Sequence, residues 1–360
     1  MVLCFHARSL ISGPDYLDLG DRLFINGAAG VDLFFVISGF IMVYTTRSSD
    51  GSIEYTLGFF CKRLARIWPV YFVLTLVYLL ATGQAALLAS AQGALQLAKS
   101  MAFYPIKLHS APIHGYPPLV VGWTLNYEVW FYALFGLSLL AGRWRWHALS
   151  ALFATFLIGV PLLLTGQVHI DAYAEYGIRP AILDLAANPL IWDFVAGVVI
   201  GLLYVSKLRI RDRSVIGSLV AIAAGLVLWQ WLSGYRAGYG PLRWGLAAAL
   251  VVLALAFYNK EHSILVPRWA RWLGDVSFSL YLVHRITQIG LPHLLKSPGN
   301  QVLFQGLAFF VANLVAALVL AHWSHRWLER GLAERVRRWL LARLPSSRRA
   351  LARLPGTARP

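Results

Sequence analysis

The stretch AAGVDLFFVISGFIMVYTT, residues 28–46, holds a single ionisable side chain, Asp32, among mainly apolar residues. As an α-helix that rises 1.5 Å per residue, this stretch is about 28 Å long, close to the roughly 30 Å thickness of the hydrocarbon layer of a bilayer. The stretch therefore predicts a membrane-spanning helix. The rest of the chain can be judged by the same measure.

Apolar segments of this kind recur along the chain and predict an all-α, polytopic membrane bundle of about ten transmembrane helices. Besides 28–46, they cover residues 1–12, 69–83, 122–141, 147–166, 187–206, 213–233, 239–258, 274–292 and 301–322. The segment 1–12 is too short to cross a bilayer, so we expect a first helix that is truncated at its N-terminus. Residues 86–104 are only mildly apolar and are predicted to form an interfacial or re-entrant helix.

The composition excludes most other classes of protein. Hydrophobic residues make up 58% of the 360 residues and charged residues 13%, whereas a soluble domain carries about 25% charged residues. So few charged side chains cannot cover a surface that faces water, which excludes a soluble enzyme, a disordered chain and a secreted disulfide scaffold. Cys4 and Cys61 follow no metal-binding spacing, and no metal site is predicted.

The distribution of basic residues predicts the orientation in the membrane. The formal net charge is +16. Lys and Arg lie between the apolar segments instead of forming one stripe, which favours an orientation signal over nucleic-acid binding. With both termini in the cytoplasm, the inner connections hold 23 Lys and Arg and the outer connections hold 7. Both termini are therefore predicted to be cytoplasmic.

The chain divides into a transmembrane region, 1–325, and a basic tail, 326–360. The tail carries ten basic residues around apolar ones such as Leu332 and Trp339, a pattern typical of an amphipathic cytoplasmic helix on anionic headgroups. Residues 345–360 are rich in Pro, Arg and Ser and are predicted to be disordered.

Two ionisable residues near the N-terminus are candidates for function, because such groups are costly at membrane depth. His6 lies in the first apolar segment, where its imidazole could act as a general base or serve as a hydrogen-bonded packing residue. Asp32 opens the segment 28–46 and either caps the helix N-terminus or orients His6.

A third candidate is Glu128, in the aromatic stretch GWTLNYEVWFY, residues 122–132. Thr124, Glu128 and Tyr132 are spaced four residues apart and share one helix face. Glu128 either takes part in catalysis or substrate binding, or forms a structural ion pair with an arginine.

A second polar face is predicted in the segment 274–292. The residues on it are Ser277, Tyr281, His284 and Gln288. Such a face fits a substrate site, and it equally fits hydrogen bonds between packed helices.

The predicted inner connection 47–68 ends in a cluster of basic residues. Lys62, Arg63 and Arg66 are three or four residues apart and share one face. Arginine forks suit phosphate groups, whereas the plainer interpretation is contact with lipid headgroups. There is no Walker loop, no GxSxG and no dinucleotide-binding loop, so these patterns do not by themselves define a reaction.

Four segments taken together resemble the membrane-bound acyltransferase 3 family. They are GVDLFFVISGF (30–40), KRLARIWPVY (62–71), GWTLNYEVWFY (122–132) and LGDVSFSLYLVH (273–284), in this order. The variant WTLNYE, with NPLIWDF at 188–194, resembles the branch that modifies exopolysaccharides. The resemblance implies an acyltransferase 3-like fold and transfer of an acyl group, usually acetyl, from cytoplasmic acyl-CoA to a sugar hydroxyl of a cell-surface glycan.

Residue roles follow from the resemblance position by position. His6 matches the histidine regarded as catalytic, and Arg63 and Arg66 match arginines associated with the donor. Glu128 matches the acidic residue of the middle motif. The family also has an Arg or Lys before the histidine, at a position that falls before Met1 here, and Asp193 stands where the family often has Glu.

The hypothesis from the sequence is a bacterial inner-membrane O-acyltransferase. Acetyl-CoA is its co-substrate, and no cofactor is permanently bound. Its other partners are a polysaccharide or lipid-linked glycan acceptor and the bilayer, with no nucleic acid.

Each candidate residue has a role in this hypothesis. His6 acts as base or carries the acyl group, and Asp32 or Glu128 orients it or positions the acceptor. The predicted CoA-binding residues are Lys62, Arg63 and Arg66, and the predicted substrate-binding residues are Trp123, Asn126, Tyr281 and His284. The alternatives are a transporter or flippase for a lipid-linked sugar and a non-catalytic scaffold.

Overall fold

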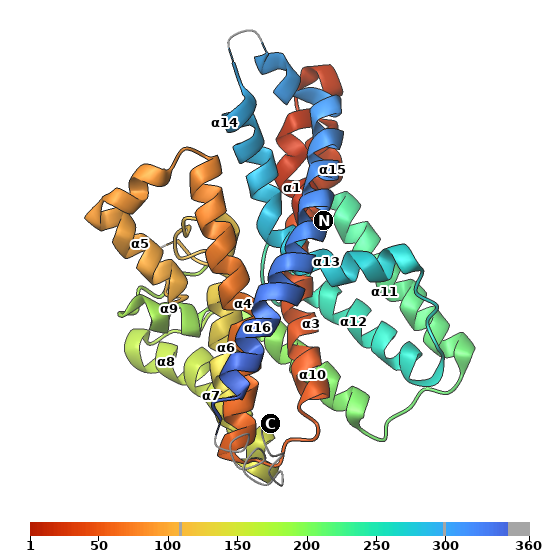
Figure 1. The fold of residues 1–360 in the computed structure, drawn as a ribbon. Coiled ribbons are helices and arrows are strands. Elements are labelled where there is room, and N and C mark those ends of the chain that lie inside the picture. Colours follow the sequence, from red (N-terminus) through yellow and green to blue (C-terminus); the bar gives the residue numbers. More distant parts are fainter. Residues whose placement is uncertain (108–109, 298–299, 345–360) are drawn as a thin grey trace, which may run out of the picture.

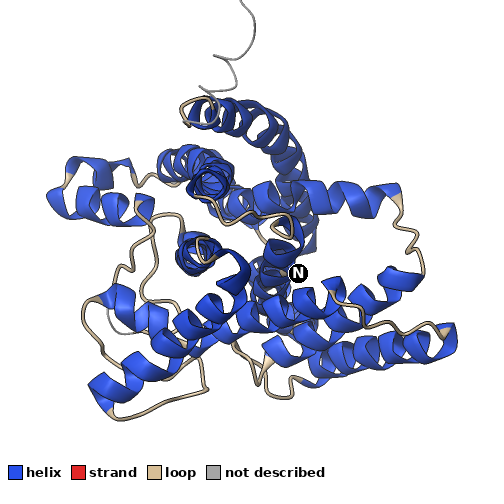
Figure 2. Ribbon diagram, turned by 90° about the horizontal axis from the view of Figure 1, so that it is seen from below, coloured by secondary structure: helices blue, strands red, loops and turns tan. Residues whose placement is uncertain are grey.

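The structure is a computed structural model that describes residues 1–107, 110–297 and 300–344 (Figure 1). Within these ranges every regular element is a helix and no strand occurs, as Figure 2 shows from below. The predicted all-α class is confirmed. The predicted disorder of 345–360 falls outside the described residues.

The helices follow one another along the chain, with long connections only between α5 and α6 and between α8 and α9 in the described residues. The α-helices are α1 (Val2–Ala7), α2 (Leu19–Phe24), α3 (Gly30–Thr45), α4 (Ile53–Ala81), α5 (Ala91–Met101), α6 (Trp123–Leu139), α7 (Arg145–Ala154), α8 (Val160–Thr165), α9 (Ala181–Ala187), α10 (Trp192–Val205), α11 (Arg213–Ser233), α12 (Trp244–Glu261), α13 (Arg268–Arg285), α14 (Leu291–Leu295), α15 (Gly306–Ser324) and α16 (Glu334–Leu341). Three π-helical turns continue a helix into the next: η7 (Thr155–Gly159), η9 (Ile286–Gly290) and η11 (His325–Ala333).

Six helices of the described chain are long and apolar enough to cross a bilayer. They are Leu19–Thr45, Ile53–Ala81, Gly142–Thr165, Arg213–Ser233, Trp244–Glu261 and Gly306–Ala342. A seventh span results if α9 and the helix Pro189–Val205, bent by 48°, cross together. The chain is therefore a multi-pass membrane protein with six or seven spans by length and composition.

The predicted count of about ten rests on segments that fall short of this measure. The helix Val2–Ile11 is apolar but short. Helix α6 has 17 residues, and α13 carries charged residues in its first turns. Ten spans therefore stay a prediction.

Helix α4 is longer than the predicted third span. It begins at Ile53, where the Ser52 hydroxyl accepts a hydrogen bond from the Tyr55 N–H at 3.1 Å, and continues through Pro69 to Ala81. Proline lacks an N–H and removes one helical hydrogen bond, but the helix runs on past it. Most of the predicted connection 47–68 is thus helical, and the basic cluster lies on a rigid element.

Helices α3 and α10 pack closely because glycines lie between them. A Cβ atom at Gly39 would lie 2.2 Å from the carbonyl oxygen of Phe194, and one at Gly197 would lie 2.0 Å from that of Val36. Small residues allow two backbones to approach in this way. This packing brings the N-terminal turns of the two helices side by side.

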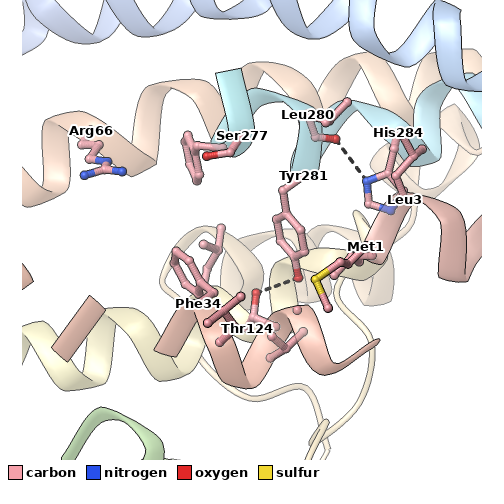
Figure 3. A pocket seen from close by; sticks show the side chains of 15 residues that line it. Met1, Leu3, Phe34, Arg66, Thr124, Ser277, Leu280, Tyr281 and His284 are labelled. Carbon is pink, nitrogen blue, oxygen red and sulfur yellow. Dashed lines mark hydrogen bonds between the residues drawn. The ribbon is translucent and has the colours of Figure 1, made fainter. Parts of the chain in front are cut away.

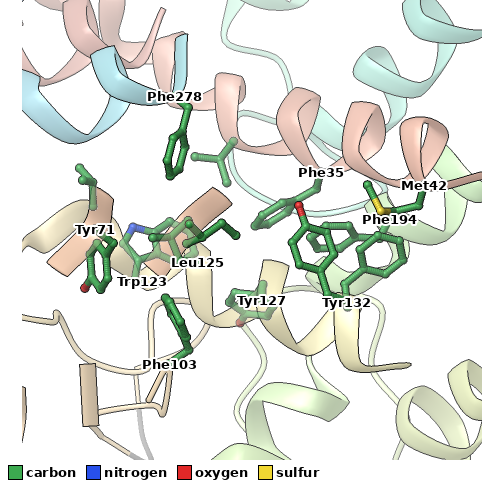
Figure 4. Close-up of a cluster of buried hydrophobic side chains, with 14 of the residues drawn as sticks. Phe35, Met42, Tyr71, Phe103, Trp123, Leu125, Tyr127, Tyr132, Phe194 and Phe278 are labelled. Atoms are coloured by element: carbon green, nitrogen blue, oxygen red, sulfur yellow. The ribbon is translucent and has the colours of Figure 1, made fainter. Parts of the chain in front are cut away.

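Helix α6 is buried on nearly all sides and forms the centre of the fold. Thirteen of its 17 residues are buried, and its aromatic rings pack against those of α3 and α10 (Figure 4). The centroid of the Phe131 ring is 4.5 Å from that of Phe194, and the Phe35 ring is 5.9 Å from Tyr127. A helix apolar all round is typical of such a central position, and its few polar side chains are therefore enclosed.

Candidate active site

A cavity of about 290 Å³, which we call the inner cavity, lies between the N-terminal segment, α3, α4, α6 and α13 (Figure 3). Its walls are mostly apolar, and its polar side chains are Arg66, Thr124, Ser277, Tyr281 and His284. Figure 3 places Arg66 at one side of the view and His284 at the other. Three residues of the predicted polar face of α13, Ser277, Tyr281 and His284, thus line this cavity over about 10 Å at 1.5 Å per residue, whereas Gln288 does not.

Two imidazoles lie side by side at one end of this cavity, and of the two only His284 lines it. The ring centroids of His6 and His284 are 5.2 Å apart, with 30° between the planes. His284 is buried and lines the cavity, and its Nδ1 lies 3.2 Å from the carbonyl oxygen of Leu280. Among the described residues its Nε2 has no hydrogen-bond partner. A proton on Nδ1, donated to Leu280, leaves Nε2 with a free lone pair.

Gln288 joins the two histidine segments. Its side-chain amide donates a hydrogen bond to the backbone carbonyl of His6, and its Oε1 accepts one from Arg285 Nη1 at 2.6 Å. Gln288 lies in the π-helical turn η9, which begins two residues after His284. Such turns are frequent at functional sites, and this one holds α1 against α13.

Tyr281 joins the α13 wall of the cavity to the wall formed by the start of α6. Its hydroxyl lies 2.8 Å from Thr124 Oγ1 and donates to the carbonyl oxygen of Val121, also at 2.8 Å. The ring centroids of Tyr281 and His284 are 6.0 Å apart. These bonds tie α13 to the start of α6, so the cavity has a defined width.

Glu128 is buried in α6, close to the basic cluster of α4. Its Oε1 accepts a hydrogen bond from the Tyr132 hydroxyl, and its Oε2 has no such partner in the described part of the chain. The guanidinium carbon of Arg63 is 5.6 Å from the Tyr132 ring centroid, and Arg66 and Arg63 interact electrostatically with the carboxylate. Tyr132 is therefore the direct partner of Glu128, and the arginines act at longer range.

Asp32 lies in the first turn of α3, as its predicted place at a helix N-terminus requires, and its carboxyl group also has partners outside that helix. Its Oδ1 accepts a hydrogen bond from the Gly240 N–H at 2.7 Å, and its carboxyl group interacts with that of buried Asp193 on α10. Both groups lie where α3 meets α10, and Asp32 connects them to the segment before α12. The structure does not place the Asp32 carboxyl group against His6.

Trp123 and Asn126 lie in the packed centre beside the cavity. Both side chains are buried. The Trp123 ring meets those of Tyr127 and Tyr239 edge-on, with centroids 6.1 Å and 5.4 Å apart. Of the predicted substrate-binding residues, the structure brings Tyr281 and His284 to the cavity wall, while Trp123 and Asn126 of α6 do not line it.

The basic cluster lines a second cavity, which we call the basic groove. It has a volume of about 370 Å³ and lies between α4 and the helix formed by η11 and α16. Lys62, Arg63 and Arg66 line the α4 side, and Arg66 lines the first cavity as well. The two spaces thus share one arginine. No three His, Cys, Asp or Glu side chains of the described ranges form a group that could hold a metal ion.

Sequence reasoning missed some contributors to these two spaces. Gln288 was recognised on the polar face of α13 but received no role. The groove residues of the tail were interpreted as headgroup contacts, because a basic amphipathic pattern does not reveal which neighbour it packs on.

Comparison with known proteins agrees with this geometry. The model of the acyltransferase domain of the acyltransferase 3 family matches residues 1–322. The exopolysaccharide production protein ExoZ of Rhizobium meliloti (strain 1021) is 32% identical over 330 residues, which cover 89% of this chain and 95% of that protein. Nodulation protein 10 of Rhizobium leguminosarum bv. viciae is 28% identical over 303 residues, 76% of this chain and 77% of that protein. No solved structure matches.

The matched region contains the inner cavity, the α4 wall of the basic groove and both histidines, and it spans nearly all of the helices that are long and apolar enough to cross a membrane. Membership of a family of acyltransferases implies acyltransferase activity. On its sequence and its helical architecture, this chain belongs to the acyltransferase 3 family.

Proposed function

We propose that this protein is an O-acyltransferase that moves an acetyl group from acetyl-CoA, bound on the cytoplasmic side, to a sugar hydroxyl of an exported or cell-surface polysaccharide. The observation that carries the proposal is the cavity that has Arg66 at one end and His284 at the other, with the His6 ring directly behind His284 at 5.2 Å between centroids. Arginine suits the phosphates of a nucleotide, and an imidazole suits a hydroxyl proton. One cavity joins these two chemistries.

The transfer step follows from the position of the imidazoles. His6 takes the proton from the acceptor hydroxyl, and the oxygen attacks the thioester carbonyl carbon. The new C–O bond forms, the C–S bond breaks, and the CoA thiolate leaves and takes up a proton. His284 Nε2, which lacks a partner in the described structure and carries a free lone pair, accepts a hydrogen bond from a neighbouring hydroxyl of the same sugar and so holds the acceptor beside His6.

The other predicted residues have supporting roles in this proposal. Lys62, Arg63 and Arg66 hold the CoA phosphates in the basic groove. Glu128 positions the acceptor from α6, and its placement near the arginines favours it over Asp32 for that role. Tyr281 lines the acceptor path, and Trp123 and Asn126 shape it from behind.

The acceptor class is inferred from the relatives. ExoZ is named for exopolysaccharide production, and this chain is similar to it over nearly its whole length. A polysaccharide, or the lipid-linked glycan from which it is made, is therefore the acceptor that we propose.

We extend the proposal to topology. The excess of Lys and Arg on one side, 23 against 7, supports about ten spans with both termini in the cytoplasm. The relatives are bacterial proteins, which supports the inner membrane as the location. Acyl-CoA then enters the basic groove from the cytoplasm, and the acceptor is reached from the opposite side.

The test uses membranes that contain the full chain or its His6→Ala variant. They are incubated with radiolabelled acetyl-CoA and extracted polysaccharide, and label in the polysaccharide is counted. We expect label with the natural chain and none above background with His6→Ala at equal membrane content. Movement of unmodified sugar without label would instead indicate a transporter, and equal polysaccharide assembly by both proteins without label would indicate a scaffold.

A further inference from the structure

The basic tail does not lie apart from the bundle. Helix α15 continues through the π-helical turn η11 into α16 and forms one long helix, Gly306–Ala342. Its second half packs along the first half of α4, as Figure 1 shows where α16 crosses beside α4. The basic groove lies at this contact, so it has one wall from α4, within the matched family region, and one from the tail.

The tail wall of the groove is also basic. Arg330 and Arg337 line it, and both are exposed to the groove and to solvent. Seven residues separate them, close to two helical turns, so they share one helix face. Opposite them stand Lys62, Arg63 and Arg66 on α4.

The acidic residues of the groove are engaged with neighbours. Glu329 Oε1 accepts hydrogen bonds from Ser279 Oγ at 2.5 Å and from the Ser279 N–H at 3.2 Å, and His325 Nδ1 lies 3.3 Å away. Glu334 Oε1 accepts one from Arg337 Nη2 at 2.7 Å. Five basic side chains face two carboxylates, so the groove keeps an excess of positive charge.

We infer that Arg330 and Arg337 form the second half of a nucleotide-phosphate site, in which the tail helix and α4 together clasp the 3′-phosphate and diphosphate of acyl-CoA. The inference rests on the proposed function and goes beyond it, because the family match ends at residue 322 and neither arginine lies within it. Coenzyme A carries phosphates at two separate places. One helix face offers donors along one line, whereas two basic walls can grip both places at once.

The groove is also tied to the catalytic helix. Ser279, whose N–H and hydroxyl bind Glu329, lies in α13 between Ser277 and Tyr281, both of which line the inner cavity. The tail wall therefore holds a fixed position relative to the helix that carries His284. A nucleotide bound in the groove would have its acyl end directed past Arg66, which lines both spaces.

The experiment compares two double variants of the full chain, purified in detergent. Arg330→Ala with Arg337→Ala removes the groove pair. Arg335→Ala with Arg338→Ala removes the same charge from exposed positions of the same helix that do not line the groove. Direct binding of radiolabelled CoA is measured, and binding needs no acyl transfer. Because a charge-assisted hydrogen bond changes affinity about tenfold or more, we expect a loss of about 100-fold in the groove variant and less than about twofold in the control.

Two further arms separate the sources of phosphate. Dephospho-CoA should bind the natural protein less tightly than CoA, and the difference should shrink in the groove variant. Equal CoA binding by the two double variants, with the groove variant alone weakened on anionic vesicles of phosphatidylglycerol, would overturn the inference and assign these arginines to lipid headgroups. If CoA binding shows the expected difference between the two double variants but the natural protein transfers no acetyl group, the proposed function is wrong and the phosphate site is supported. Size-exclusion profiles confirm that each variant is folded.

Discussion

The two ends of the inner cavity are built in opposite ways. At the imidazole end, His284 is buried, and His6 is held beside it by a hydrogen bond between its backbone and Gln288. At the arginine end, Arg66 is exposed and opens into a groove with four other basic side chains. The imidazole end therefore has a buried side chain with few polar neighbours, and the arginine end has an exposed side chain among several basic ones.

Because of this contrast, substitutions at the two ends should change different kinetic constants. A proton acceptor acts only at the reacting atoms, so its removal lowers kcat. Cations that grip a distant phosphate bind the ground state and the transition state alike, so removal of one raises KM and leaves kcat nearly unchanged. Since the groove has several cations, the remaining ones keep part of the affinity for acyl-CoA when one is replaced.

The largest effect is expected from the two histidines. His6→Ala and His284→Ala should each lower kcat for polysaccharide acetylation by about 10²- to 10⁴-fold, the range of a general base. The double variant should be no worse than the weaker single one, because groups that act as a unit are not additive. Initial rates of labelled acetyl transfer at saturating acetyl-CoA measure this. Losses that multiply in the double variant would show that the rings act independently.

A smaller effect is expected at the arginine end. Arg66→Ala should raise KM for acetyl-CoA about tenfold, the value of one charge-assisted hydrogen bond, with kcat within about threefold of the natural protein. Arg66→Lys keeps the charge but loses the forked guanidinium, so its KM should lie between those of the natural protein and Arg66→Ala. A complete acetyl-CoA saturation curve separates KM from kcat. A fall in kcat alone would erase the contrast between the two ends.

The smallest effect is expected from Asp32, which belongs to neither end. Asn keeps an oxygen that can accept the hydrogen bond from the Gly240 N–H, so Asp32→Asn should change kcat by less than about threefold. Asp32→Ala removes that acceptor and should lower the detergent melting temperature, because a buried donor left without a partner costs about 1–3 kcal/mol. A kcat loss in Asp32→Asn as large as that of His6→Ala would give Asp32 a catalytic role.

Much of the candidate site could be predicted from local patterns. The spacing of Ser277, Tyr281 and His284 indicated one helix face, and that face lines the cavity. The spacing of Lys62, Arg63 and Arg66 indicated one basic face, and it lines the groove. Such patterns are readable because helical periodicity depends only on neighbours along the chain.

Other parts of the site depend on contacts between distant segments. Asp32 lies in the first turn of its helix, as predicted, but its hydrogen bond with the Gly240 N–H depends on the close packing of α3 on α10, which no local pattern specifies. The tail pattern fitted a membrane surface, but α16 packs on α4. Amphipathicity records that a face will be covered and does not record by what.

Hydrophobic length, charge and ordered motifs are properties of the chain, so they were enough to predict a helical, multi-pass membrane protein of the acyltransferase 3 family. The pairing of His6 with His284 and the position of Arg66 on the walls of two cavities became visible in the folded molecule alone. Those relations depend on close packing between segments far apart in the chain, which local sequence patterns do not specify.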